Sequence, residues 1–298
     1  MIRLLALVLA MLLAAGPAYA ERPVGLDTLA GARYSTTEVG GGGARDSTTE
    51  VGGGGARYST TEVGGGGARY SATEHARPLA GRVIVIDPGH QLGNHNFPHK
   101  INRPVPAGGF RKPCNTTGTA TNGGYPEATF VWRVSKALES RLERLGATVK
   151  LTRTTNSQRR WGPCVDARGR AGNQVHADAK ISVHGDGSYA SGARGFHVIA
   201  PTDRRPWTHD IYKPSKRLAV DTRAALKRKG VPVANYIAGG DGLDFRSDLG
   251  TLNLSDIPTV MVELGNMRNA SDAHRMTSPR GRQRYAAALA DAVRRFLR

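Results

Sequence analysis

Three segments of this 298-residue chain place a potential metal ligand or proton carrier directly after a short apolar run. His90 follows Val-Ile-Val-Ile-Asp-Pro-Gly, His184 follows Ile-Ser-Val, and Glu263 follows Val-Met-Val. If these runs are parallel strands, their carboxyl ends meet at one edge of a sheet, which is where open α/β sheets form their sites. The pattern therefore predicts that the three side chains converge.

A fourth group, Glu127, lies beside Pro126 at the start of a strong helical pattern that follows the first of these runs. Two histidines and one glutamate are a common ligand set for catalytic zinc, with one position left for water. A second glutamate nearby is then free to act as a base. The pattern alone leaves open which glutamate would bind the ion, and a histidine that ends a strand often has only a structural role.

The elements that must position these groups alternate along the chain. Strands are expected at about 82–86, 148–152, 180–184, 195–200 and 258–263, and helices at 126–145, 165–175, 215–229 and from 278 onward. This alternation predicts an α/β fold, in which a mostly parallel central sheet has helices on both faces. Residues 91–125 are rich in Gly, Pro and Asn and are expected to form a long loop, which in a compact domain is often functional.

From about Arg82 to Arg298 the chain resembles the zinc-dependent N-acetylmuramoyl-L-alanine amidases of the Amidase_3 family. The resemblance rests on five motifs in order, namely Val-Ile-Asp-Pro-Gly-His (85–90), Pro-Glu-Ala (126–128), Arg-Gly-Arg-Ala-Gly-Asn (168–173), Ser-Val-His-Gly-Asp (182–186) and Val-Glu-Leu-Gly-Asn-Met-Arg-Asn (262–269). Gly172 and Gly185 depart from the residues that the family usually has. Both are neighbours of functional positions, so they bear on substrate preference rather than on the chemistry.

The resemblance implies a zinc enzyme that hydrolyses the amide bond between N-acetylmuramic acid and L-alanine in peptidoglycan, in wall turnover, remodelling or daughter-cell separation. It implies His90, Glu127 and His184 as zinc ligands and Glu263 as the catalytic carboxylate. Two other functions stay open, namely a zinc peptidase or deacetylase of another envelope polymer and a non-catalytic wall-binding protein. An intact Glu263 beside a complete ligand set argues against the last.

Several other polar residues have simpler interpretations. His95 and His99 lie in the long loop and are expected to be exposed to solvent, while His197 receives no role. Arg168 and Asn173 match family positions and are expected to brace the cleft rather than to contact substrate. Asp87 is expected to orient its own turn, with a contact to a zinc-binding histidine as an alternative.

The first part of the chain is expected to direct export and then to act as a spacer. Residues 1–20 combine Arg3, an apolar run and Ala-Tyr-Ala before Glu21, which is typical of a signal peptide; an uncleaved anchor is the alternative. Residues 21–78 contain a Gly-rich repeat of twelve residues, which predicts a flexible linker. Residues 79–298 are then the catalytic domain.

Charge and cysteine content fit an exported protein. Forty-two Lys and Arg against 24 Asp and Glu give a formal net charge of +18, which attracts polyanions. Outside the cell, anionic cell-wall polymers are better candidates than nucleic acid, although a diffuse solubilising surface is the simpler explanation. Cys114 and Cys164 are expected to form a disulfide in an oxidising compartment. We expect a monomer that is secreted or periplasmic, associated with the cell wall, and not inserted in a membrane after leader cleavage.

Overall fold

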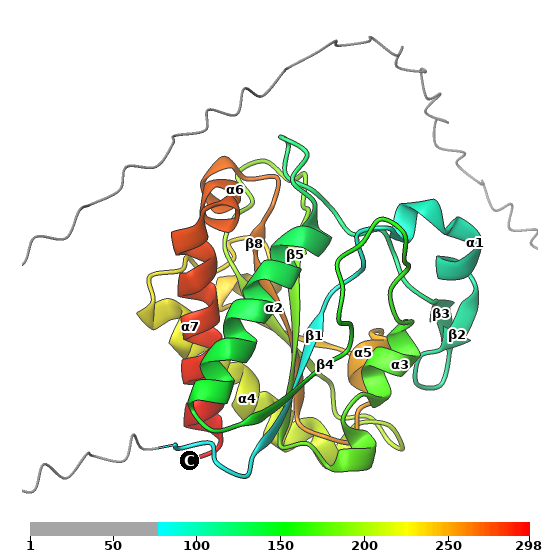
Figure 1. The fold of residues 1–298 in the computed structure, drawn as a ribbon, viewed down its shortest axis with the longest axis vertical. Coiled ribbons are helices and arrows are strands. Elements are labelled where there is room, and N and C mark those ends of the chain that lie inside the picture. The colour runs from blue at the N-terminus through cyan, green and yellow to red at the C-terminus, as the bar shows by residue number, and fades with distance from the viewer. Residues whose placement is uncertain (1–76) are drawn as a thin grey trace, which may run out of the picture. The chain divides into compact units, whose positions relative to one another are not determined.

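The computed structural model describes residues 77–298 (Figure 1). The predicted signal peptide and nearly all of the predicted linker lie outside these residues, so both stay predictions. The described residues contain a six-stranded sheet in the order β4-β1-β5-β8-β6-β7 and a separate two-stranded sheet. Within them, no helix has the length and apolar character needed to cross a membrane.

The central sheet is mostly parallel, as predicted. Four neighbouring strands run in one direction, namely β4 (Thr148–Leu151), β1 (Val83–Pro88), β5 (Ala179–Asp186) and β8 (Thr259–Asn266). The remaining two run the other way, because β6 (His197–Pro201) is antiparallel to β8 and β7 (Leu243–Arg246) is parallel to β6. The carboxyl ends of β1, β5 and β8 therefore lie at one edge.

Helices cover both faces of the sheet, which confirms the predicted α/β architecture (Figure 1). The longer ones pack on one face, namely α2 (Glu127–Arg144), α4 (His209–Arg228), α6 (Ala270–Thr277) and α7 (Pro279–Phe296). The other face carries the short helices α3 (Val165–Arg170) and α5 (Gly250–Asn253). Short helices leave room on this second face for a cavity.

Alternation along the strands gives the two faces different chemistry, since successive side chains point to opposite sides of a sheet. Toward the long helices, apolar residues such as Ile86, Val183 and Val262 join one large core. Toward the short helices, the same strands present mainly polar and charged side chains, namely Asp87, Lys180, Ser182, His184, Thr259 and Glu263. The polar side chains of the sheet thus lie mainly on the face that the helices cover least.

The predicted loop 91–125 is partly ordered by short elements. It contains the 3-10 turn η1 (Asn94–Asn96), helix α1 (Pro98–Ile101) and an antiparallel hairpin formed by β2 (Pro104–Pro106) and β3 (Arg111–Pro113). The predicted disulfide is confirmed, because Cys114 just after β3 is bonded to Cys164 at the start of α3. The hairpin is therefore covalently tied to the short-helix side of the sheet.

Other element boundaries differ from the prediction. The helix expected at 165–175 is two pieces, because Gly172 takes a φ of +94° between α3 and the 3-10 turn η2 (Asn173–Val175). Helix α4 begins at His209 and continues through Pro214. Strand β7, helix α6 and the 3-10 turn η3 (Ala238–Gly240) were not expected.

Lys180 is a fully buried cation on the polar face of β5. Its ammonium donates to the carbonyl oxygens of Arg168 at 3.2 Å and Gly169 at 2.5 Å, at the C-terminal end of α3. Burial lowers the pKa of Lys180 to about 7, although Asp87 and Asp256 oppose the shift. The folded protein therefore binds the proton on Lys180 less tightly than the unfolded chain does.

We expect this group to make the free energy of unfolding rise with pH between about pH 7 and pH 10. In that window the unfolded chain still holds a proton that the folded chain has released, which is the condition for stability to increase with pH. The contribution is at most about 1.4 kcal/mol per pH unit. Denaturant titrations at several pH values measure it. Lys180→Met should lose this part of the slope, and the exposed control Lys213→Met should keep it; equal slopes in both variants would contradict the assignment.

Candidate metal centre

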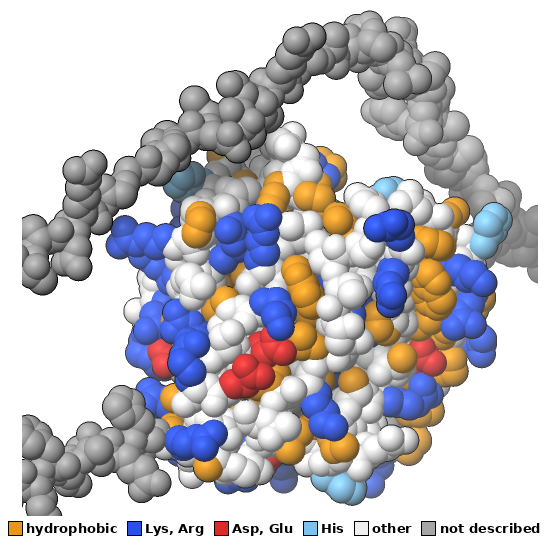
Figure 2. Space-filling model, in the orientation of Figure 1, with side chains coloured by type: hydrophobic (Ala, Val, Ile, Leu, Met, Phe, Trp, Pro, Cys, Tyr) orange, Lys and Arg blue, Asp and Glu red, His pale blue; other side chains and the backbone are white. Residues whose placement is uncertain are grey.

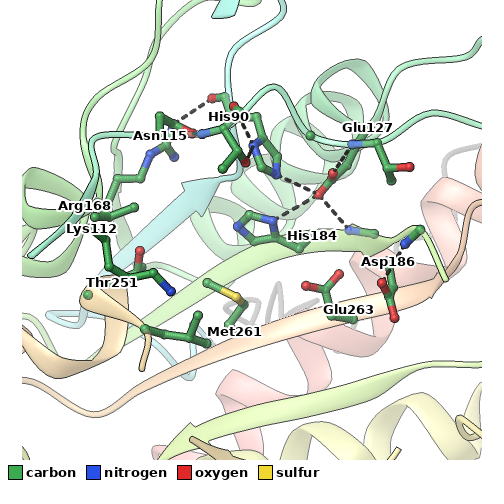
Figure 3. Close-up of a pocket in the computed structure, with 18 of the residues that line it drawn as sticks. His90, Lys112, Asn115, Glu127, Arg168, His184, Asp186, Thr251, Met261 and Glu263 are labelled. Carbon is green, nitrogen blue, oxygen red and sulfur yellow. Dashed lines mark hydrogen bonds and ion pairs between the residues drawn. The ribbon is translucent and has the colours of Figure 1, made fainter. Parts of the chain in front are cut away.

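His90, Glu127 and His184 meet at the carboxyl edge of the sheet (Figure 3). Glu127 Oε1 lies 3.2 Å from His90 Nε2 and 3.0 Å from His184 Nδ1. One ligand atom from each residue lies within 4.8 Å of the other two, which is close enough to share one ion. The structure thus brings together the three residues that the sequence analysis named as ligands.

His90 is presented by the turn that follows β1 and has a left-handed backbone, with a φ of +54°. Its Nδ1 lies 3.1 Å from the carbonyl oxygen of Thr116. A carbonyl only accepts hydrogen bonds, so this contact favours a proton on Nδ1 and leaves a lone pair on Nε2, the nitrogen that faces Glu127. That tautomer is the one that metal binding through Nε2 requires, so His90 is suited to be a metal ligand.

Glu127 opens α2 and is buried, with 3% of its surface exposed. Its Oε1 also accepts a hydrogen bond from the backbone N–H of Gly185 at 3.1 Å, and Oε2 accepts one from Thr119 at 2.9 Å. Burial would raise the pKa of Glu127, but His90 and His184 outweigh it and hold that pKa well below its ordinary value. The carboxylate is therefore ionised and fixed in orientation.

A buried ion pair supports the His90 turn from behind. Arg168 Nη1 lies 2.5 Å from Asp87 Oδ1, and neither side chain has more than 3% of its surface exposed. The same guanidinium donates to the carbonyl oxygens of Pro88 at 2.7 Å and His90 at 2.6 Å. Although burial would raise the pKa of Asp87, Arg168 keeps it below the ordinary value. Both residues brace the site, as the sequence analysis expected of Arg168.

Arg153 is a second brace, which the sequence analysis missed. It follows β4 and donates to the carbonyl oxygens of Pro88 at 3.0 Å, Gly89 at 3.2 Å and Ala128 at 2.9 Å. Burial lowers the pKa of Arg153 to about 9, and Arg168 adds to the shift. Arg153 could have been identified from its position just after β4, but only if β4 had been known to pair with β1. The sequence alone does not give that strand order.

Glu263 lies on β8, next to His184 in the register of the sheet. Its Oε2 is buried and has no hydrogen-bond partner among the described residues, and the residue lines the same cavity as the three ligands. Burial raises the pKa of Glu263 well above its ordinary value, and Glu127 and Asp186 raise it further. A carboxyl that binds protons more readily than usual is suited to proton transfer near neutral pH.

The ligand cluster opens into a cavity of about 370 Å³ between the hairpin, α3, α5 and the strand ends. Lys112, Thr116, Leu249, Thr251 and Met261 are among the residues that line it. The cavity is large enough for a small substrate, and the cluster beside it can hold a metal ion that polarises a carbonyl group. The unpaired carboxyl can then move a proton next to that carbonyl.

Other candidates lie outside the cluster. His95 and His99 are exposed, as expected, and are not part of the ligand group. Asn173 braces a different region, where it bonds to the carbonyl oxygen of Leu254 and to Asp256. Asp186, which the sequence analysis did not single out, lines the cavity and accepts a hydrogen bond from Tyr236 at 2.6 Å.

An α/β sheet with a His–Glu–His cluster and a free carboxyl at its carboxyl edge defines a candidate metallohydrolase. Comparison with known proteins is more specific. The Amidase_3 family model, described as N-acetylmuramoyl-L-alanine amidase, matches residues 84–295. The chain belongs to this family, a family of hydrolases that act on the wall polymer peptidoglycan outside the cytoplasm.

Individual relatives cover the same region. The chain is 45% identical over 222 residues to the N-acetylmuramoyl-L-alanine amidase Rv3717 of Mycobacterium tuberculosis, covering 74% of this chain and 88% of that protein. It is also similar to crystal structures of the amidase Ami1 from Mycobacterium smegmatis (38% identity, TM-score 0.68, 74% and 98% of the chains) and Mycobacterium abscessus (42%, 0.68, 74% and 100%).

Gly89 offers a test of the centre that leaves its ligands unchanged. A Cβ at this position would lie 2.4 Å from Cε1 of His184, so Gly89→Ala must displace that ring. We expect the affinity for a divalent metal ion, measured with zinc as the probe, to fall about 10- to 100-fold, the range for disturbed ligand orientation, with the fold retained. Competition with a chromogenic chelator measures the affinity, and circular dichroism checks the fold.

The matched control for this prediction is Gly123→Ala. A Cβ there would come no closer than 3.9 Å to any other group, the nearest being Thr121 Oγ1. Zinc affinity in this variant should equal that of the wild type. Equal affinities in Gly89→Ala and Gly123→Ala would refute the proposed geometry.

Proposed function

We propose that the chain hydrolyses the amide bond between N-acetylmuramic acid and L-alanine of peptidoglycan with one zinc ion held by His90, Glu127 and His184. Glu263 is the catalytic carboxylate. The proposal is supported above all by the convergence of the three ligand atoms within 4.8 Å beside an unpaired carboxyl, in a chain that belongs to an amidase family.

Zinc suits this donor set because two imidazoles and one carboxylate are ligands of catalytic zinc, and the open side of the cluster faces the cavity. When bound, the ion supplies Lewis-acid chemistry, which polarises the scissile carbonyl and makes water more acidic. Residues of the chain orient the ligands: the carbonyl oxygen of Thr116 orients His90, and the backbone N–H groups of Thr119 and Gly185 orient Glu127.

Glu263 would move the proton that amide hydrolysis requires. It accepts a proton from the attacking water as the new C–O bond forms, and it returns that proton to the alanine nitrogen as the C–N bond breaks. A deprotonated amine is a poor leaving group, so the alanine nitrogen must gain a proton as the C–N bond breaks. The second transfer is therefore as necessary as the first. The raised pKa of Glu263 suits this carboxyl group to both proton transfers.

Analysis of the products tests the bond that is cut. With zinc, we expect digestion of muramyl peptides to release intact stem peptides that begin with L-alanine and carry a free amino group. A chelator should abolish this release, and added zinc should restore it, because the polarising charge is lost and regained. Mass spectrometry identifies the fragments. Cleavage between two amino acids or loss of acetate would instead indicate a peptidase or a deacetylase.

Glu263→Gln separates metal binding from catalysis. The amide has nearly the same shape but cannot accept the proton, so we expect kcat to fall by about 10²- to 10⁴-fold. Zinc affinity should stay at the wild-type value, because Glu263 is not in the ligand group. Retained hydrolysis of muramyl peptides by this variant would remove Glu263 from the mechanism.

We also propose that the protein is exported by its N-terminal segment and is secreted or periplasmic, at the wall. Six of the 42 basic and seven of the 24 acidic residues precede residue 77, which leaves 36 against 17, a net charge of +19, on the described residues. Figure 2 shows Lys and Arg side chains over the visible face with few acidic ones among them. This charge supports attraction to anionic wall polymers, which salt would screen.

A further inference from the structure

The cavity beside the metal centre carries a cation that the proposed reaction does not use. Lys112, on β3, lines the cavity and has 36% of its side chain exposed. Arg168 also lines it, but its guanidinium is buried and engaged by Asp87 and by backbone carbonyl groups. Among the described residues of the lining, Lys112 is therefore the permanently charged cation that can meet a ligand.

Among the residues that the structure describes, Lys112 has one acidic partner, Asp248, which it shares with another cation. Its Nζ lies 2.9 Å from the carbonyl oxygen of Asp248 and 3.5 Å from the Oδ2 of the same residue. That carboxylate already accepts two hydrogen bonds of 2.8 Å from Arg246, which hold the pKa of Asp248 at about 2. Asp248 is thus shared by two cations and pairs more closely with Arg246, so within residues 77–298 Lys112 has no carboxylate of its own.

Charge is distributed unevenly around the cavity. Figure 3 places Lys112 and Thr251 on one side, and Asp186 and Glu263 on the other. An anionic group on a ligand is attracted to the Lys112 side and repelled from the acidic side. The cavity is therefore polarised in a way that can orient a substrate with one charged end.

The strand that carries Lys112 is held in place. Directly after β3, Cys114 is bonded to Cys164, and the carbonyl oxygen of Cys114 accepts a hydrogen bond of 2.7 Å from Val165. These links fix the hairpin against α3, and the hydrogen bond to the carbonyl oxygen of Asp248 holds the Lys112 ammonium, so the cation is positioned before a ligand arrives. A cation placed in advance gains more from a charge-assisted hydrogen bond than one that must be ordered.

We propose that Lys112 binds a free carboxylate on the stem-peptide residue that follows L-alanine, and so makes the enzyme prefer a carboxylate over a carboxamide there. This inference rests on the proposed function, which puts the amide bond of L-alanine at the metal centre and the stem peptide in this cavity. Lys112 and the three metal ligands line one cavity of about 370 Å³, which holds a ligand of short-peptide size, so the carboxylate is sought close to the alanine rather than at the far end of the stem.

Two muramyl peptides that differ only in a carboxylate or a carboxamide at that residue test the assignment. We expect the zinc-loaded wild-type protein to favour the carboxylate by about three- to tenfold in kcat/KM, mainly through KM, as for one charge-assisted hydrogen bond. Lys112→Met and Lys112→Gln should hydrolyse both peptides equally well, and Lys112→Arg should keep the preference. The control Lys227→Met, on α4 behind the sheet, removes the same charge and should also keep it.

Two results would overturn the proposal: equal kcat/KM for both peptides in the wild type, or an unchanged preference in Lys112→Met. Either could occur while L-alanine-terminated peptides are still released, and the proposed function would then stand. If the wild type with zinc hydrolyses neither peptide, the proposed function fails and this inference fails with it.

Discussion

The ion pair between Asp87 and Arg168 holds the turn on which the whole centre depends. His90 has a left-handed backbone, which non-glycine residues adopt only where the surroundings enforce it. Arg168 supplies that constraint by binding the carbonyl oxygens of Pro88 and His90 while Asp87 neutralises it. Removing one partner would leave a buried charge without its counterpart, which typically costs about 3–5 kcal/mol. The pair is therefore a condition for the position of His90.

One face of the sheet packs into the hydrophobic core, and the other carries the candidate site. Toward α2, α4 and α7 the strands contribute apolar side chains to one large core. Toward α3 and α5 they contribute polar groups, and the short helices leave a cavity over them. The ligands come from a strand end, a turn and the first residue of a helix, so the site stands on rigid elements. Glu263 comes from a neighbouring strand, which places a proton carrier beside the cluster without making it a ligand.

Strand ends and one helix start could be predicted from the sequence because apolar periodicity and Pro126 mark them clearly. From the same signals we predict that His90, Glu127, His184 and Glu263 lie at one edge of the sheet, and the structure places them there. The bracing role of Arg153 could not be predicted, since it depends on β4 lying beside β1. The break after α3 was missed because Gly172 has a left-handed φ that no periodicity reveals. Short elements such as β7 and α5 depend on tertiary packing more than on local pattern.

The bond between Cys114 and Cys164 has a consequence for motion. The hairpin and α3 form two walls of the cavity, and most of the chain between β1 and α2 lacks regular structure. Segments of that kind usually fluctuate independently on fast timescales. Here a covalent link joins the two walls directly, so it restricts the movement of the hairpin that carries Lys112 relative to α3.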